Sequence, residues 1–307
     1  MKILPLILLF APLSASLHAQ TIDDGIMMAR HNISVGDVYS HDRWDQYWEG
    51  ALKRVNGNIG TITTQTNILT ATYGVTDRWN VIATVPYVWT RASLGVLQGM
   101  KGFQDIALAG KYKFLERSSA KYGSLRTIAV VSAGIPLSDY TPDFQPLSIG
   151  LASTRVSGRF TLNYQSTPGW FLNGSTAYTW RRQVTLDRPY YFTDGQLFLT
   201  DQVDMPNVFD YIVSGGRLTR GLMAELSFSQ QRTLGGGDIR RQDIPFVSNR
   251  MNFSKVGAMV MYPLPKFKSL AFRFAYAYTI DGRNVGQAST LTTGVLFRYR
   301  VHGRTTQ

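Results

Sequence analysis

The segment LAFRFAYAYTI, residues 270 to 280, alternates large apolar or aromatic side chains with small or basic ones. Successive side chains of a β-strand point to opposite faces, so Phe272, Phe274 and Tyr276 share one face. That face is too hydrophobic to contact water along its whole length. The other face, with Arg273 and Ala275, has smaller side chains than the water-exposed face of a strand in a soluble sandwich. The segment therefore predicts a strand between lipid and a narrow lumen.

The same alternation recurs at residues 103–115, 154–166, 222–231 and 291–301. In lipid every backbone polar group has to be hydrogen-bonded within the protein, and a closed barrel meets this requirement for strands. We therefore predict an all-β fold, a single antiparallel transmembrane β-barrel of about twelve strands, an even number as in most bacterial barrels. The expected strands lie near residues 30–40, 58–75, 78–92, 103–115, 122–136, 152–166, 169–184, 206–219, 221–234, 250–263, 268–281 and 288–302.

The connections between these strands alternate in length. Tight turns are expected at residues 76–77, 167–169, 220–221 and around Lys266, and the long loops are expected at residues 41–57, 185–205 and 235–249. Outer-membrane barrels have short periplasmic turns and long extracellular loops. We therefore expect the outer membrane of a Gram-negative bacterium, with both chain ends in the periplasm.

The first residues, MKILPLILLFAPLSASLHAQ, have the layout of a secretory signal peptide, with cleavage expected after Ala19. The expected organisation is a signal peptide over 1–19, a periplasmic N-terminal segment over 20–29, the barrel over 30–302 and a periplasmic tail over 303–307. No later stretch approaches about 18 uninterrupted apolar residues, so membrane-spanning helices are not expected. The absence of cysteine excludes disulfides, cysteine-ligated metals and a lipid-modified N-terminal cysteine.

Tryptophan spacing supports the membrane interpretation. Trp79 and Trp89 lie ten residues apart on one face of an expected strand, and Trp170 and Trp180 repeat this spacing on another. Ten strand residues of about 3.3 Å each, tilted by about 40°, climb about 25 Å, the height of the apolar band between aromatic girdles. We predict that these four residues form the girdles, because a soluble barrel gives no reason for the spacing.

The inward faces carry an excess of basic side chains, in a chain with a formal net charge of +12. A basic lumen favours anions, whereas the alternative is that arginines fill a narrow barrel and bond to the few acids, amides and water. A nucleic-acid partner is not expected, because no duplex fits inside a barrel. The predicted pore-lining residues are Lys111, Lys113, Arg126, Arg155, Arg159, Arg181, Arg217, Lys255, Arg273, Arg298, Arg300, Asp105, Asp210 and Glu225.

Two of the long loops combine aromatic and acidic side chains. The predicted ligand-capture residues are Trp44, Trp48, Tyr190, Tyr191 and Phe192. Aromatic faces beside carboxylates can bind a flat or sugar-like ligand, but such loops also fold over a barrel mouth without binding one. No fixed ligand spacing supports a metal site in the acidic loops.

Signals for catalysis are weak. His31 with Ser34 on one expected strand is only a faint sign of barrel phospholipase chemistry, and no histidine stands in a convincing triad arrangement. The run from Gly235 to Asp238 lacks the lysine and the helix of a phosphate-binding loop. We expect no catalytic residues, no metal and no cofactor.

Two stretches, YGVTDRWNVIATVPYV at 73–88 and GFQDIALAGKYKFL at 102–115, resemble the outer-membrane family labelled putative MetA-pathway of phenol degradation. Members usually show a richer Gly-Asp cluster where this chain has residues 102–105. The resemblance implies an outer-membrane barrel associated with uptake of aromatic or other hydrophobic compounds. It supplies no catalytic residues.

Three functions stay open at this point. The first is passive uptake of small hydrophobic or aromatic compounds, aromatic acids included; the second is an anion-selective porin or acidic-oligosaccharide channel; the third is a non-conducting structural or ligand-binding barrel. The expected partners are outer-membrane lipid, a small-molecule solute and the barrel-assembly machinery during biogenesis. The oligomeric state is left open.

Overall fold

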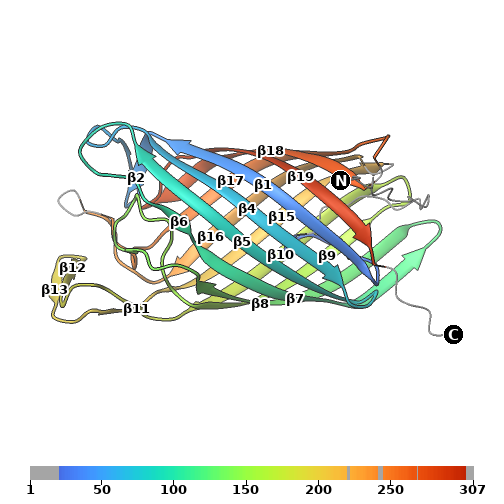
Figure 1. The fold of residues 1–307 in the computed structure, drawn as a ribbon, viewed down its shortest axis with the longest axis horizontal. Helices are drawn as coiled ribbons and strands as arrows, with labels where there is room; N and C mark the ends of the chain where they lie inside the picture. Colours follow the sequence, from blue (N-terminus) through green and yellow to red (C-terminus); the bar gives the residue numbers. More distant parts are fainter. Residues whose placement is uncertain (1–20, 220–221, 241–244, 268, 302–307) are drawn as a thin grey trace, which may run out of the picture.

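A computed structural model of the chain describes residues 21–219, 222–240, 245–267 and 269–301. Within these ranges twelve long antiparallel strands form a closed barrel (Figure 1). The long strands are β1 (Asn32–Trp44), β4 (Ile62–Gly74), β5 (Trp79–Ala92), β7 (Asp105–Ser119), β8 (Gly123–Pro136), β9 (Arg155–Gln165), β10 (Trp170–Arg181), β15 (Asn207–Thr219), β16 (Leu222–Leu234), β17 (Asn252–Pro263), β18 (Leu270–Arg283) and β19 (Ser289–Arg300).

Each long strand pairs with the next one along the chain, and β1 closes the barrel by pairing with β19. The predicted fold and its twelve strands are confirmed, with bounds that differ by a few residues. The predicted signal peptide at 1–19, the turn at 220–221 and the tail at 303–307 lie outside the described residues. No helix in the described part of the chain is long and apolar enough to cross a membrane.

The two faces of the strands differ as the alternation predicts. On β18 the side chains of Phe272, Phe274 and Tyr276 are 46%, 58% and 49% exposed, because they point outward. Ala271 and Thr279, which point inward on the same strand, are each 1% exposed. The inner face has little exposed surface because inward side chains and other parts of the chain occupy the narrow lumen.

The connections at the two ends of the barrel differ in length, as Figure 1 shows. At the end with the tight turns, the Thr76 hydroxyl accepts hydrogen bonds from the backbone N–H groups of Arg78 and Trp79, at 3.1 and 2.9 Å. At the opposite end the loops carry the short strands. These are β2 (Gln46–Glu49), β3 (Leu52–Val55), β6 (Lys101–Phe103), β11 (Val184–Thr185), β12 (Tyr191–Thr193), β13 (Gln196–Phe198) and β14 (Gln202–Val203).

The long loops pack around an apolar core of their own. It joins the loop between β10 and β15 to the loop between β16 and β17. Its buried members are Val184, Leu186, Tyr191, Val203, Met205, Phe246 and Val247. This core packs the two loops against each other at the loop end of the barrel.

Replacing Phe274 by arginine tests which face contacts lipid. A cation at mid-strand on the lipid face is expected to lower the free energy of unfolding by about 2–4 kcal/mol, whereas Ala275→Ser on the inward face is expected to change it little. The measurement is reversible unfolding in lipid vesicles. Equal losses for the two variants would contradict the assignment of the faces.

Candidate functional site

The lumen is the candidate site, and the strand register decides which predicted residues line it. Thirteen of the fourteen predicted pore-lining residues have the inward parity on their strands. They are Lys111, Lys113, Arg126, Arg155, Arg159, Arg181, Lys255, Arg273, Arg298, Arg300, Asp105, Asp210 and Glu225.

Arg217 is the exception and points outward. It lies opposite Trp170 in the sheet, and its guanidinium group stands 5.4 Å from the centre of that indole ring. The prediction that Arg217 lines the pore is wrong because the preceding residues, Ser214, Gly215 and Gly216, contain no apolar side chain that would mark the outer face. The guanidinium instead makes a cation–π contact on the outer surface.

Much of the luminal positive charge is paired with carboxylates. Arg155 bonds to Asp105 and Arg159 bonds to Asp210, each at 2.7 Å. Glu116 accepts from both Lys113 and Arg126 near the tight-turn end. These pairs support the alternative that arginines fill a narrow barrel, because they neutralise part of the predicted basic surface.

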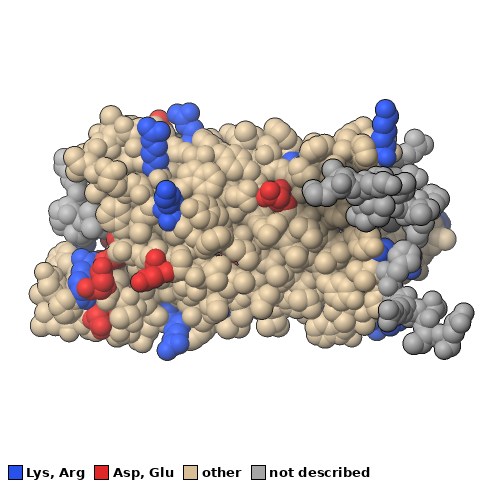
Figure 2. Space-filling view, in the orientation of Figure 1, with Lys and Arg blue, Asp and Glu red and all other residues tan. Residues whose placement is uncertain are grey.

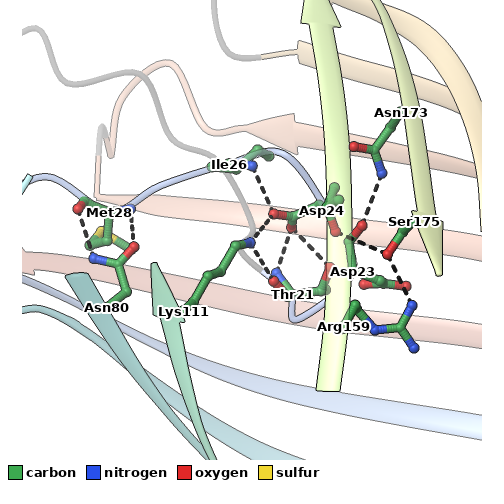
Figure 3. A network of polar contacts seen from close by, with 11 residues as sticks. Thr21, Asp23, Asp24, Ile26, Met28, Asn80, Lys111, Arg159, Asn173 and Ser175 are labelled. Carbon is green, nitrogen blue, oxygen red and sulfur yellow. Dashed lines mark hydrogen bonds and ion pairs between the residues drawn. The ribbon is translucent and has the colours of Figure 1, made fainter. Parts of the chain in front are cut away.

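The main occupant of the lumen is the start of the described chain. Residues 21–28, here named the luminal segment, run inside the barrel against β5, β7 and β10 (Figure 3). Residues 20–29 are predicted to lie in the periplasm, but the structure places residues 21–28 in the lumen. No alternating pattern marks this stretch, so sequence periodicity could not predict its place.

Lys111 of β7 anchors the luminal segment. Its side chain is fully buried, and its ammonium group donates to the Thr21 carbonyl oxygen and to Asp24 Oδ1, both at 2.7 Å. A buried ammonium group is costly unless it is paired and hydrogen-bonded. The ion pair with Asp24 offsets this cost, so it stabilises the luminal segment in the lumen.

Asp24 also folds the segment into a compact turn. Its carboxylate accepts from the backbone N–H groups of Thr21 and Ile26, at 2.5 and 2.8 Å. Asn80 bonds reciprocally to the N–H and C=O groups of Met28, both at 2.9 Å, and the Asn173 amide donates to the Asp23 carbonyl at 2.9 Å. Side-chain amides on the wall thus satisfy backbone groups that no strand pairs.

Apolar contacts complete the fit. Met27 packs against an inward-facing apolar patch made of Ile82, Ala109, Ile128 and Val130, which surrounds the strand position of Lys111. Met27 is only partly buried, so this contact contributes less than the about 1.5–3 kcal/mol of a fully buried methionine side chain. The site therefore combines a cation with an apolar wall.

Glycine is required at position 25. A Cβ atom built there would lie 2.3 Å from the Cβ of Asn163 and 2.1 Å from its Cγ. Contacts this short leave no room for any other residue while Asn163 keeps its place. Gly25 therefore lets the backbone of the luminal segment approach β9 closely.

A polar cavity of about 220 Å³ remains beside the luminal segment. Asp23 and Asp24 line one side, and Glu225 and Arg273 line the other. Three carboxyl groups thus face one guanidinium group. With the luminal segment in place, the centre of the lumen therefore contains more carboxyl groups than the predicted pore-lining residues supply.

At the loop end, residues 137–154 contact the inner wall at β5 and β7. Tyr140 donates to Asp105 Oδ1 at 2.7 Å, and the opposite oxygen of that carboxylate accepts from Arg155. Burial, reinforced by the hydrogen bond to Asp105, raises the pKa of the Tyr140 hydroxyl. The Thr90 hydroxyl donates to the carbonyl of Leu147, a residue with no exposed surface. Residues 137–154 therefore occupy part of the lumen at the loop end, in addition to the luminal segment.

The predicted ligand-capture residues divide into two groups. Tyr191 is 7% exposed because its ring stacks between Phe198 and Phe246, at centroid distances of 5.0 and 5.1 Å. Trp48 is also 7% exposed, since it packs against the backbone near Gly282. The faces of these two rings are covered, so they hold loops together, and capture by them is not supported.

The other capture candidates are more open. Tyr190 and Phe192 are 53% and 51% exposed, whereas Trp44 contacts Tyr47 at a centroid distance of 6.2 Å and lies close to Gly286. Ligand capture by Trp44, Tyr190 and Phe192 stays a prediction.

The predicted girdle residues have outward positions. Trp79, Trp170 and Trp180 are 48%, 57% and 47% exposed, and Trp89 lies on the same face of β5 as Trp79, in contact with Tyr39. Their depth in a membrane stays a prediction.

No group of three or more metal-ligating side chains occurs among the described residues. His31 contacts the Tyr73 hydroxyl at 3.2 Å, and no triad forms around it in the part of the chain that the structure covers.

Lys111→Met tests the anchor of the luminal segment. Breaking a buried ion pair costs about 3–5 kcal/mol, and the segment can avoid much of this cost by leaving the lumen. We expect the Ile26 and Met28 amides to exchange with deuterium about a hundredfold faster, which corresponds to about 3 kcal/mol. Lys255→Met is the matched control, since Lys255 also faces inward but has no hydrogen bond to residues 21–28. Unchanged exchange in Lys111→Met would show that Lys111 does not hold the segment.

Comparisons with known proteins agree with this architecture. An outer-membrane channel from Pseudomonas putida F1, described as COG4313, has a TM-score of 0.71 at 14% identity, over 92% of this chain and 100% of that chain. At such low identity the likeness shows the fold alone. The NanC porin (TM-score 0.49, 10% identity, 86% of this chain, 98% of that chain) and a mutant of the TodX monoaromatic hydrocarbon channel (0.45, 10%, 90%, 91%) are too dissimilar to support an inference.

No curated protein matches the sequence. The family model described as putative MetA-pathway of phenol degradation matches residues 53–293, which is most of the chain. The chain therefore belongs to the family of putative MetA-pathway of phenol degradation proteins, and its fold is that of an outer-membrane barrel.

Proposed function

We propose that the chain is a passive outer-membrane channel for small aromatic or other apolar compounds, and that aromatic carboxylates fit its lumen best. The observation that carries this proposal is the pairing of Lys111 with Asp24 beside the apolar patch that contacts Met27. The luminal segment thus places a carboxylate and an apolar side chain on adjoining parts of the wall. A deprotonated aromatic acid has the same two features.

We expect passage to require movement of the luminal segment, because residues 21–28 occupy much of the lumen at the depth of Lys111. The expected mature chain starts only one residue before Thr21, so the segment has a free end that can withdraw. A solute carboxylate competes with Asp24 for the Lys111 ammonium group. The solute ring competes with Met27 for the apolar patch.

Displacement of the segment also changes the charge of the lumen. Asp23 and Asp24 leave with it, so Lys111 loses its ion-pair partner. The balance of the remaining wall shifts towards Lys and Arg, and rings of such residues favour anions. The shift supports an anion-selective channel, the second function left open above, in the state with the segment displaced.

A non-conducting barrel is the second candidate. The specific observation in its favour is that the luminal segment and residues 137–154 occupy the lumen together. Such a barrel binds a ligand in the cavity beside Glu225 and Arg273 without passing it. Conductance separates the two candidates.

Deletion of residues 21–28 behind an intact signal peptide is the direct test. In planar bilayers the full chain is expected to conduct rarely, and the deleted chain is expected to open in large steps that prefer chloride to potassium. Arg155→Glu with Arg159→Glu is expected to lower or invert this preference, because both side chains face the lumen.

A heat-modifiability gel serves as the control that each variant is a folded barrel. Persistent silence of a folded deletion variant would support the non-conducting barrel. Cation preference of the deleted chain would refute the anion-selective state. Uptake of neutral aromatics that the two arginine substitutions leave unchanged would favour apolar solutes over aromatic acids.

A further inference from the structure

The outward face of β1 and β4 is more polar than the outward face of β9. It carries a continuous set of polar side chains, here named the polar stripe. Its members are Asp37, Tyr39 and His41 on β1, and Gln65 and Asn67 on β4. On β9, by contrast, the outward side chains Val156, Phe160 and Leu162 are apolar and 44–46% exposed. Figure 2 shows one side of the barrel, where an acidic side chain stands on a middle region that otherwise has little charge.

Asp37 lies at a depth where the wall is expected to contact lipid chains. It stands opposite Leu69 on β4, and Leu69 stands opposite Val85 on β5. Val85 lies between Trp79 and Trp89, the two expected girdle residues of β5. On the predicted girdle positions, Asp37 therefore falls inside the apolar band.

The two residues directly opposite Asp37 in the sheet offer it no polar partner. The carboxyl group is exposed, and its register neighbours Leu69 and Val295 are 52% and 39% exposed apolar side chains. Across the described residues, neither Asp37 nor Asn67 has an intramolecular side-chain hydrogen bond. Tyr39 and Gln65 satisfy each other at 2.6 Å.

A charged side chain on the lipid face of a barrel is destabilising, and lipid tails supply no hydrogen-bond donor. The carboxylate of Asp37 accepts hydrogen bonds only, whereas the amide of Asn67 has two N–H donors. Asn67 lies one step of the β1–β4 register beyond Asp37, opposite Tyr39. Acceptor and donor are thus side by side on one surface, at similar depth.

We propose that the polar stripe is the contact surface of a homodimer, in which Asp37 of each chain accepts a hydrogen bond from Asn67 of the partner subunit. A two-fold axis along the membrane normal keeps every residue at its depth. It also sets β1 of one chain against β4 of the other. A two-fold interface is self-complementary, and the Asp37–Asn67 pair meets this condition twice.

A second copy is favoured over an unrelated partner because the chain already carries the required donor at the required depth. An alternative partner for Asp37 would be a Lys or Arg on the lipid face, between the levels of the expected girdles. Among the described residues of β4, β5 and β10, no Lys or Arg has such a position. Arg217 stands at the level of Trp170, at the edge of the band.

Cross-linking tests the proposed interface, since the chain contains no native thiol. Two differently tagged chains, one with Asp37→Cys and one with Asn67→Cys, are produced together, and their isolated outer membranes are oxidised. The matched control uses Val213→Cys and Leu172→Cys, which have the same diagonal relation on the outward faces of β15 and β10. We expect a disulfide-linked pair carrying both tags for the stripe and little for the control.

Equal cross-linking of the two pairs, or none at the stripe, would overturn the proposal. Sedimentation of the detergent-solubilised wild type and Asp37→Leu supplies a second readout that needs no thiol. A dimer mass for the wild type and a monomer mass for a folded Asp37→Leu chain support the interface. A monomer mass for both, without cross-links, would show that lipid tolerates Asp37 at this position.

Discussion

Closure of the sheet is the constraint on which the rest of this structure depends. In lipid each strand needs a hydrogen-bonded neighbour on both sides, and the pairing of β1 with β19 supplies the last one. Twelve strands enclose only a narrow lumen, so long side chains from opposite walls approach one another. The buried ion pairs, the inward-facing amides and the luminal segment all follow from this confinement.

Confinement explains why the luminal segment lies inside the barrel. An empty lumen would leave Lys111 without a carboxylate and the apolar patch in contact with water. The segment meets both needs, at the cost of ordering its own backbone. The conformational entropy that the segment loses on ordering weakens its net binding to the lumen. A solute with a carboxylate and a ring can therefore compete with the segment.

The sequence predicts the barrel well, because alternation of side chains is local and has a period of two. It predicts the inward position of Lys111 or Arg159 for the same reason. It fails at Arg217, where glycines remove the alternation, and it could not place residues 21–28, whose contacts to Asn80 and Asn173 are far apart in sequence. Asp23 and Asp24, four and five residues after the expected cleavage site, are the one sequence signal that points to this placement, because acids are attracted to a basic lumen.

A reversible tether of the luminal segment tests the central claim most directly. A Cβ atom at position 25 would lie 2.3 Å from that of Asn163. A disulfide needs a Cβ separation of about 3.5–4.5 Å, so cysteines at the two positions can be linked only after the luminal segment shifts by about 1–2 Å within the lumen. In a chain with Gly25→Cys and Asn163→Cys, the account predicts silence in planar bilayers under oxidising conditions and openings after addition of a reductant. Equal conductance in both conditions, with the disulfide verified by mass spectrometry, would show that the luminal segment does not control the lumen.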